Sequence, residues 1–107
     1  MRVLLDESMP RALGFAITGH FARTAQTAGL AGLLNGELLV AMKASNFDVL
    51  VTFDQNLPYQ QSTALPVAVV VLVASNNRVE TAMRFVPGLL NVLASLKSGQ
   101  LVKLALD

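Results

Sequence analysis

Residues 48–56, Asp-Val-Leu-Val-Thr-Phe-Asp-Gln-Asn, contain a short apolar run that stops at an acid. Val49, Leu50 and Val51 follow one another without alternation, which is typical of a strand covered on both faces. Residues 2–7, Arg-Val-Leu-Leu-Asp-Glu, repeat this pattern at the start of the chain. If both strands belong to one parallel sheet, their acids lie at the same edge, outside the carboxyl ends of the strands, where open α/β sheets bind ligands.

Strand-like and helix-like segments alternate along the rest of the chain, with no internal repeat or linker. We expect strands near residues 2–5, 20–25, 49–53, 67–73 and 101–106. We expect helices from Pro10 to Gly19, from Asn35 to Ser45, and from Arg78 to about Lys97 with an interruption at Pro87-Gly88. This order predicts a single α/β domain over residues 1–107, a three-layer α/β/α sandwich with a mostly parallel sheet and right-handed crossovers.

Composition limits the classes of partner. Eight basic and seven acidic residues give a net charge of +1, which predicts neither strong binding to nucleic acid nor repulsion from it. Charged residues make up only 14% of the chain and apolar residues 53%, so we expect a homo-oligomer or an obligate partner that covers an apolar patch. The absence of cysteine excludes thiolate metal sites and disulfides.

Two observations bear on the cellular location of the protein. Asp6 and Glu7 interrupt the first apolar run after four residues, which does not suit a signal peptide. The most apolar stretch, residues 64–74, is far shorter than the ~20 residues that span a bilayer. We therefore expect a cytoplasmic protein with no membrane partner.

The few acids give the candidate chemistry. Asp6 and Asp54 each end a strand, Glu37 opens a helix, and Asn56 follows Asp54 closely. Clustered carboxylates suit Mg²⁺ or Mn²⁺, which prefer oxygen ligands, and a bound metal would assist phosphodiester hydrolysis. Each acid also has a structural interpretation, because aspartate begins turns and a glutamate in a first helical turn is favoured by the helix dipole. Asp48, at the opposite edge, is expected to be structural.

Four further side chains are candidates for binding the substrate. Arg11 follows the first strand and could hold a phosphate, although a solvated helix residue is the plainer interpretation. Tyr59 could stack on a base. Ser75 and Asn76 end the fourth strand near the same edge, where they could position a water or metal, or cap the helix that follows.

Three segments together resemble short PIN-like proteins. Residues 3–11, Val-Leu-Leu-Asp-Glu-Ser-Met-Pro-Arg, look like the opening strand of that family, which ends in Leu-Leu-Asp-Glu-Asn-Leu-Pro-Arg. Residues 32–39, Gly-Leu-Leu-Asn-Gly-Glu-Leu-Leu, and residues 48–57, Asp-Val-Leu-Val-Thr-Phe-Asp-Gln-Asn-Leu, follow in the family's order and spacing. The resemblance covers most of residues 2–105.

The resemblance implies an α/β/α sandwich and a ribonuclease site that depends on magnesium or manganese. Many members are toxins of toxin–antitoxin pairs, so RNA, a small antitoxin protein and a second copy of the chain are the implied partners. By position, Asp6 matches the first metal-binding acid and Asp54 the third. Asn56 stands where the family often has a further acid, and Asn35 where a related pattern has aspartate, with Glu37 as a displaced substitute. An inactive relative that serves as an interaction module is therefore an alternative.

Response-regulator receiver domains offer another alternative, in which Asp54 would accept a phosphoryl group. The receiver pattern can be matched to four further residues, Asp6, Glu7, Ser75 and Lys103. Against it, Lys103 lies inside the last expected strand, and the loop after Asp54 lacks the usual Met-Pro and glycine signals. Only one strand-like region separates the first strand from residue 48.

Overall fold

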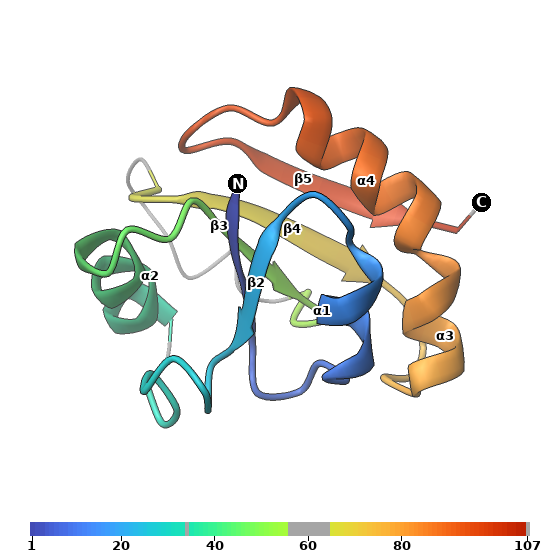
Figure 1. The fold of residues 1–107 in the computed structure, drawn as a ribbon, viewed down its shortest axis with the longest axis horizontal. Coiled ribbons are helices and arrows are strands. Elements are labelled where there is room, and N and C mark those ends of the chain that lie inside the picture. Colours follow the sequence, from blue (N-terminus) through green and yellow to red (C-terminus); the bar gives the residue numbers. More distant parts are fainter. Residues whose placement is uncertain (34, 56–64, 107) are drawn as a thin grey trace.

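The computed structural model describes residues 1–33, 35–55 and 65–106, and for Asn35 only the backbone. Five strands form one sheet in the order β2-β1-β3-β4-β5, and every neighbouring pair is parallel (Figure 1). The strands are β1 (Arg2–Leu5), β2 (Phe21–Thr24), β3 (Val49–Thr52), β4 (Ala68–Val73) and β5 (Leu101–Ala105). The α/β class and the parallel sheet expected from the sequence are thus confirmed.

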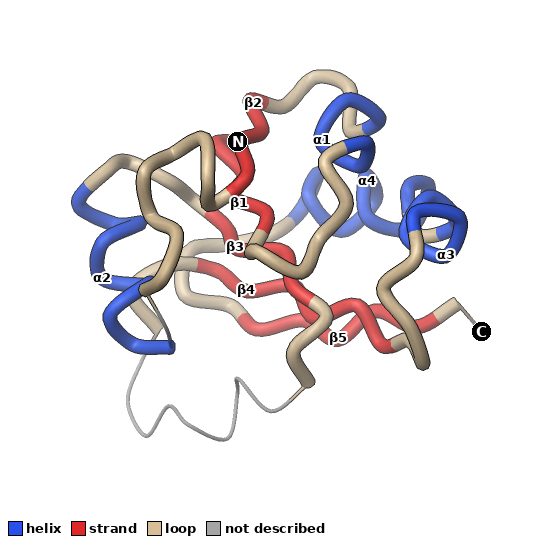
Figure 2. The backbone as a smooth tube through the Cα atoms, turned by 90° about the horizontal axis from the view of Figure 1, so that it is seen from below, coloured by secondary structure: helices blue, strands red, loops and turns tan. Residues whose placement is uncertain are grey.

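The four helices of the described residues lie on both faces of this sheet. They are α1 (Ala12–Ala16), α2 (Asn35–Ala44), α3 (Val79–Arg84) and α4 (Val86–Ser95). Figure 2 shows α2 on one side of the strands and α1, α3 and α4 on the other, an arrangement compatible with a three-layer sandwich. None of these helices is long and apolar enough to cross a membrane.

Alternate residues of the inner strands supply two separate cores. Val3 and Leu5 of β1 face the core shared with α1 and α4, whereas Leu4 faces the core shared with α2. The two cores explain why β1, β3 and β4 are continuous apolar runs, because both faces of each strand exclude water. Polar side chains of these strands can therefore reach the solvent only at the strand ends.

The crossovers do not all have the same hand. From β1 to β2 the chain moves toward one edge of the sheet through α1, and from β4 to β5 it moves toward the other edge through α3 and α4 on the same face. The two connections therefore have opposite hands, and the uniformly right-handed crossovers expected from the sequence are wrong for one of them. The physical reason is that α3 and α4 share an apolar layer with α1 rather than with α2.

Local signals mark several element ends correctly. Asn46, after α2, has a φ of 66°, the left-handed conformation that stops a helix. The helical segment after β4 is broken at Phe85, and Pro87 lies in the first turn of α4, where its missing N–H costs nothing. The interruption expected near Pro87 is confirmed.

Candidate functional site at the carboxyl edge of the sheet

Asp6 directly follows β1 and lies beside the end of β3. Its backbone N–H donates to the carbonyl of Val51 at 3.3 Å, which extends the pairing of the two strands by one residue. The side chain is half-buried, so its carboxylate stands at the boundary between the sheet and the solvent. The placement of Asp6 at the carboxyl edge, expected from the sequence, is found in the structure.

Thr52 joins the two strand ends. This last residue of β3 is 1% exposed, and its hydroxyl donates to the Asp6 carboxylate oxygen Oδ2. The same hydroxyl oxygen accepts the backbone N–H of Asp54 at 2.9 Å. One buried hydroxyl thus connects the acid after β1 to the backbone of the acid after β3, and it brings Asp6 and Asp54 to the same point of the edge.

Ser8 holds the other oxygen of the Asp6 carboxylate. The Ser8 backbone N–H and hydroxyl both donate to Oδ1, at 3.0 and 2.7 Å. This is the Asx-type turn that the structural interpretation of Asp6 anticipates. An ionised carboxylate offers about four acceptor positions, so the three bonds from Ser8 and Thr52 orient the group and still leave it able to bind a cation.

The remaining acids lie apart from this junction. Glu37 is exposed in the first turn of α2, on the opposite face from α1. The Glu7 carboxylate accepts the backbone N–H of Gly32, which ties the loop after β1 to the loop before α2. No group of three acidic or histidine side chains close enough to hold a metal occurs within residues 1–33, 35–55 and 65–106. Asn56, the fourth expected ligand, lies outside the described residues.

The segment after β4 reaches the same edge. The Asn77 side-chain amide donates to the carbonyl of Ser8 at 3.3 Å, so this segment lies against the turn that holds Asp6. Asn76 has a structural role, because its Oδ1 accepts the Arg78 N–H at 3.0 Å and the Thr81 hydroxyl at 2.7 Å at the start of α3. Ser75 is exposed beside them.

Two other residues lie outside the Asp6–Thr52–Asp54 junction. Asp48, which opens β3 at the opposite edge, accepts the backbone N–H of Arg2 at 2.7 Å, so its expected structural role is confirmed. Arg11 precedes α1 and lines a cavity between α1 and β2. Tyr59, a fourth substrate-binding candidate, lies outside the described residues.

Sequence reasoning did not identify Thr52 or Ser8 as parts of the site. The signal for Thr52 was present: it is the one polar residue in the run Val49–Thr52, and it precedes an acid by two positions. A hydroxyl in a fully buried strand needs a hydrogen-bond partner, and the nearest polar groups in a parallel sheet are those at the end of the neighbouring strand.

The junction offers oxygen ligands of the kind that a hard divalent cation prefers. Two carboxylates at one edge can suffice for Mg²⁺, which usually keeps several waters and uses substrate phosphates as further ligands. The oriented carboxylate of Asp6 and the position of the Asp54 backbone beside it are compatible with such an ion.

No protein-family model, curated protein or solved structure matches this chain. Any assignment of function therefore depends on the residues and geometry of the site itself.

The Thr52 junction makes a direct prediction. Replacing Thr52 by valine keeps the shape but leaves the Asp54 N–H without its acceptor, so we expect a loss of about 1–3 kcal/mol in the free energy of unfolding. Amide hydrogen exchange at Asp54 should become faster in this variant. Thr52→Ser, which keeps the hydroxyl, should retain the slow exchange; equal protection of the Asp54 amide in Thr52→Val and the wild type would show that the hydroxyl is not its acceptor.

Proposed function

We propose that this protein is a ribonuclease of the PIN-like type that depends on Mg²⁺ or Mn²⁺. The observation that carries the proposal is the Asp6–Thr52–Asp54 junction, which puts two acids at the carboxyl edge of a parallel sheet. The resemblance of residues 3–11, 32–39 and 48–57 to PIN-like proteins supports the same assignment. Asp6 and Asp54 would be the main metal ligands, and Asn56 is a further candidate from the sequence; Glu37, also expected from the sequence, lies apart from them.

The chemistry follows from the types of residue at the edge. A bound divalent cation would polarise a phosphodiester oxygen and lower the pKa of an attacking water. Asp6 is suited to hold it because Ser8 and Thr52 fix the orientation of its carboxylate before any ligand arrives. The Arg11 guanidinium, which has no hydrogen bond or ion pair to the described residues, would be able to bind an RNA phosphate.

Two partners belong to this proposal besides RNA: a small antitoxin protein and a second copy of the chain. The high apolar content and the exposed Val40 of α2 and Met83 of α3 support covered surfaces, because burial of apolar side chains away from water is favourable. If the site proves inactive, the same surfaces support the alternative of an interaction module.

The proposed nuclease is tested by cleavage of a random-sequence single-stranded RNA pool with Mn²⁺ or with a chelator. We expect cleavage only with metal, and we expect Asp6→Asn and Asp54→Asn each to lower the rate on the order of 100-fold. The matched control is Asp48→Asn, which changes an aspartate at the opposite edge and should keep the wild-type rate once its folded fraction is measured. Cleavage by Asp6→Asn at the wild-type rate, or no cleavage by the wild type with Mn²⁺, would contradict the proposal.

One observation favours a second candidate, a receiver-like phosphoacceptor. The strand order β2-β1-β3-β4-β5 is the doubly wound order that receiver domains share, and Asp54 follows β3 as a phosphorylated aspartate would. Two observations oppose it: Lys103 lies in the middle of β5 instead of after it, and α3 and α4 lie on the α1 face.

Mass spectrometry after incubation with Mg²⁺ and acetyl phosphate separates the two candidates. A phosphoaspartate adds one phosphoryl group to the protein mass. Under the nuclease proposal we expect no added mass on the wild type. A phosphoryl group that Asp54→Asn removes would favour the receiver-like function.

A further inference from the structure

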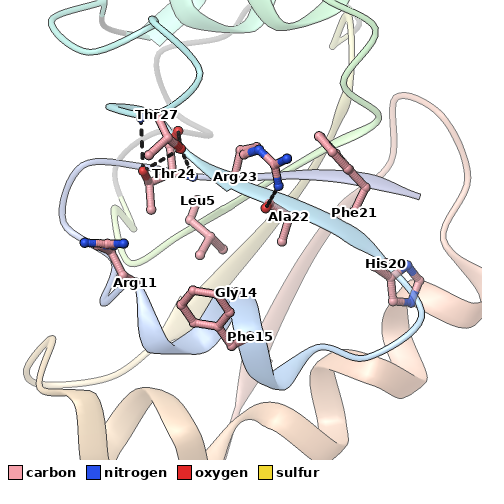
Figure 3. A pocket seen from close by; sticks show the side chains of 10 residues that line it. All are labelled: Leu5, Arg11, Gly14, Phe15, His20, Phe21, Ala22, Arg23, Thr24 and Thr27. Carbon is pink, nitrogen blue, oxygen red and sulfur yellow. Dashed lines mark hydrogen bonds between the residues drawn. The ribbon is translucent and has the colours of Figure 1, made fainter.

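A cavity of about 330 Å³ lies between α1 and β2 (Figure 3). Its volume is at the lower end of the range for small-molecule sites. Leu5, Gly14 and Ala22 contribute apolar surface, whereas Thr24, Arg23 and Arg11 contribute polar groups. Leu5 is followed directly by Asp6, so one end of the cavity adjoins the carboxyl edge.

The charge of this cavity suits an anion. Arg11 comes from the turn before α1 and Arg23 from β2, and none of the ten described residues that line the cavity is acidic. Neither guanidinium has an ion pair within the described part of the chain. Burial and the nearby amino terminus lower the pKa of His20, so this imidazole is neutral near pH 7 and the positive charge comes from the arginines.

Two aromatic rings border the cavity, and one of them is largely exposed to solvent. The Phe21 ring is occupied by cations, because the guanidinium carbons of Arg2 and Arg23 lie 4.2 and 4.1 Å from its centroid. Phe15 is 81% exposed, and its ring stands at the cavity beside Gly14 in Figure 3. An exposed ring near cationic side chains is the arrangement on which nucleic-acid bases stack.

The edge of β2 is closed to an added strand. The Thr24 N–H donates to Thr27 Oγ1 at 3.1 Å, and the Thr24 carbonyl accepts the Thr27 hydroxyl at 3.1 Å and the Ala28 N–H at 3.0 Å. The Ala22 carbonyl accepts Arg23 Nη1 at 3.0 Å. A peptide that paired with β2 would have to break these bonds, so the edge disfavours a peptide strand and leaves the cavity to a compact ligand.

We propose that the α1–β2 cavity binds a phosphate-bearing aromatic ligand of mononucleotide size. The positive charge of Arg11 and Arg23 attracts the phosphate, and the ring of the ligand stacks on Phe15. The ligand is either a free nucleotide or one nucleotide unit of a single-stranded RNA. This binding requires no metal and no cleavage, so it can be tested separately from the nuclease proposal.

Calorimetric titration in the presence of a chelator tests the cavity with four probes: AMP, UMP, inorganic phosphate and a 2′-O-methyl RNA hexamer that cannot be cleaved through its 2′-hydroxyl. We expect AMP and UMP to bind more tightly than inorganic phosphate. Arg23→Gln and Arg11→Gln should each weaken binding about tenfold, and Phe15→Ala about five- to 100-fold. All three side chains are exposed, so these variants should fold.

Lys43→Gln is the matched control, because it removes one exposed cation from α2 on the opposite face and should leave binding unchanged. Tighter binding of the hexamer than of either nucleotide, lost in Phe15→Ala, identifies RNA as the source of the ligand; binding of nucleotides alone identifies a free nucleotide. The proposal is overturned if neither AMP, UMP nor the hexamer binds, if inorganic phosphate binds as well as they do, or if Lys43→Gln weakens binding as much as Arg23→Gln.

Discussion

The hydrogen bonds of the Thr52 hydroxyl determine what the carboxyl edge of this sheet can do. Thr52 is buried, and it donates to Asp6 and accepts from the backbone of Asp54. A buried hydroxyl that lost either partner would cost free energy, so the two strand ends are held together by the need to satisfy it. Ser8 adds two more bonds to Asp6. The acid is thereby oriented by the fold before a ligand binds, which is the condition for precise binding of a cation.

The sequence was sufficient for the features that depend on local or periodic patterns. Continuous apolar runs predicted strands covered on both faces, and the two cores on either side of the sheet bear this out. The helix end expected near Ser45 agrees with α2, after which Asn46 has the positive φ that stops a helix. The carboxyl edge followed from the parallel arrangement of β1 and β3. These inferences need only the neighbours of a residue in the chain and the general geometry of parallel sheets.

The features that were missed depend on which surfaces meet in three dimensions. The hand of the β4–β5 connection follows from the packing of α3 and α4 beside α1, and apolar periodicity does not say which face a helix covers. Likewise, the bond between Gly32 and Glu7 joins residues 25 positions apart, and the cavity depends on Arg11 and Arg23 arriving from different elements. Arg11, expected as a phosphate ligand, lines this cavity.

The proposed function requires that the ends of β1 and β3 form one cation site. Paramagnetic broadening of amide NMR signals by Mn²⁺, added below one equivalent, locates a bound ion directly in the intact protein. If the cation binds at this junction, the amide signals of Asp6, Thr52 and Asp54 broaden first, while the amide signal of Asp48 at the opposite edge stays sharp. Broadening centred on Asp48 or on Glu37 alone, or equal broadening throughout the chain, would contradict it.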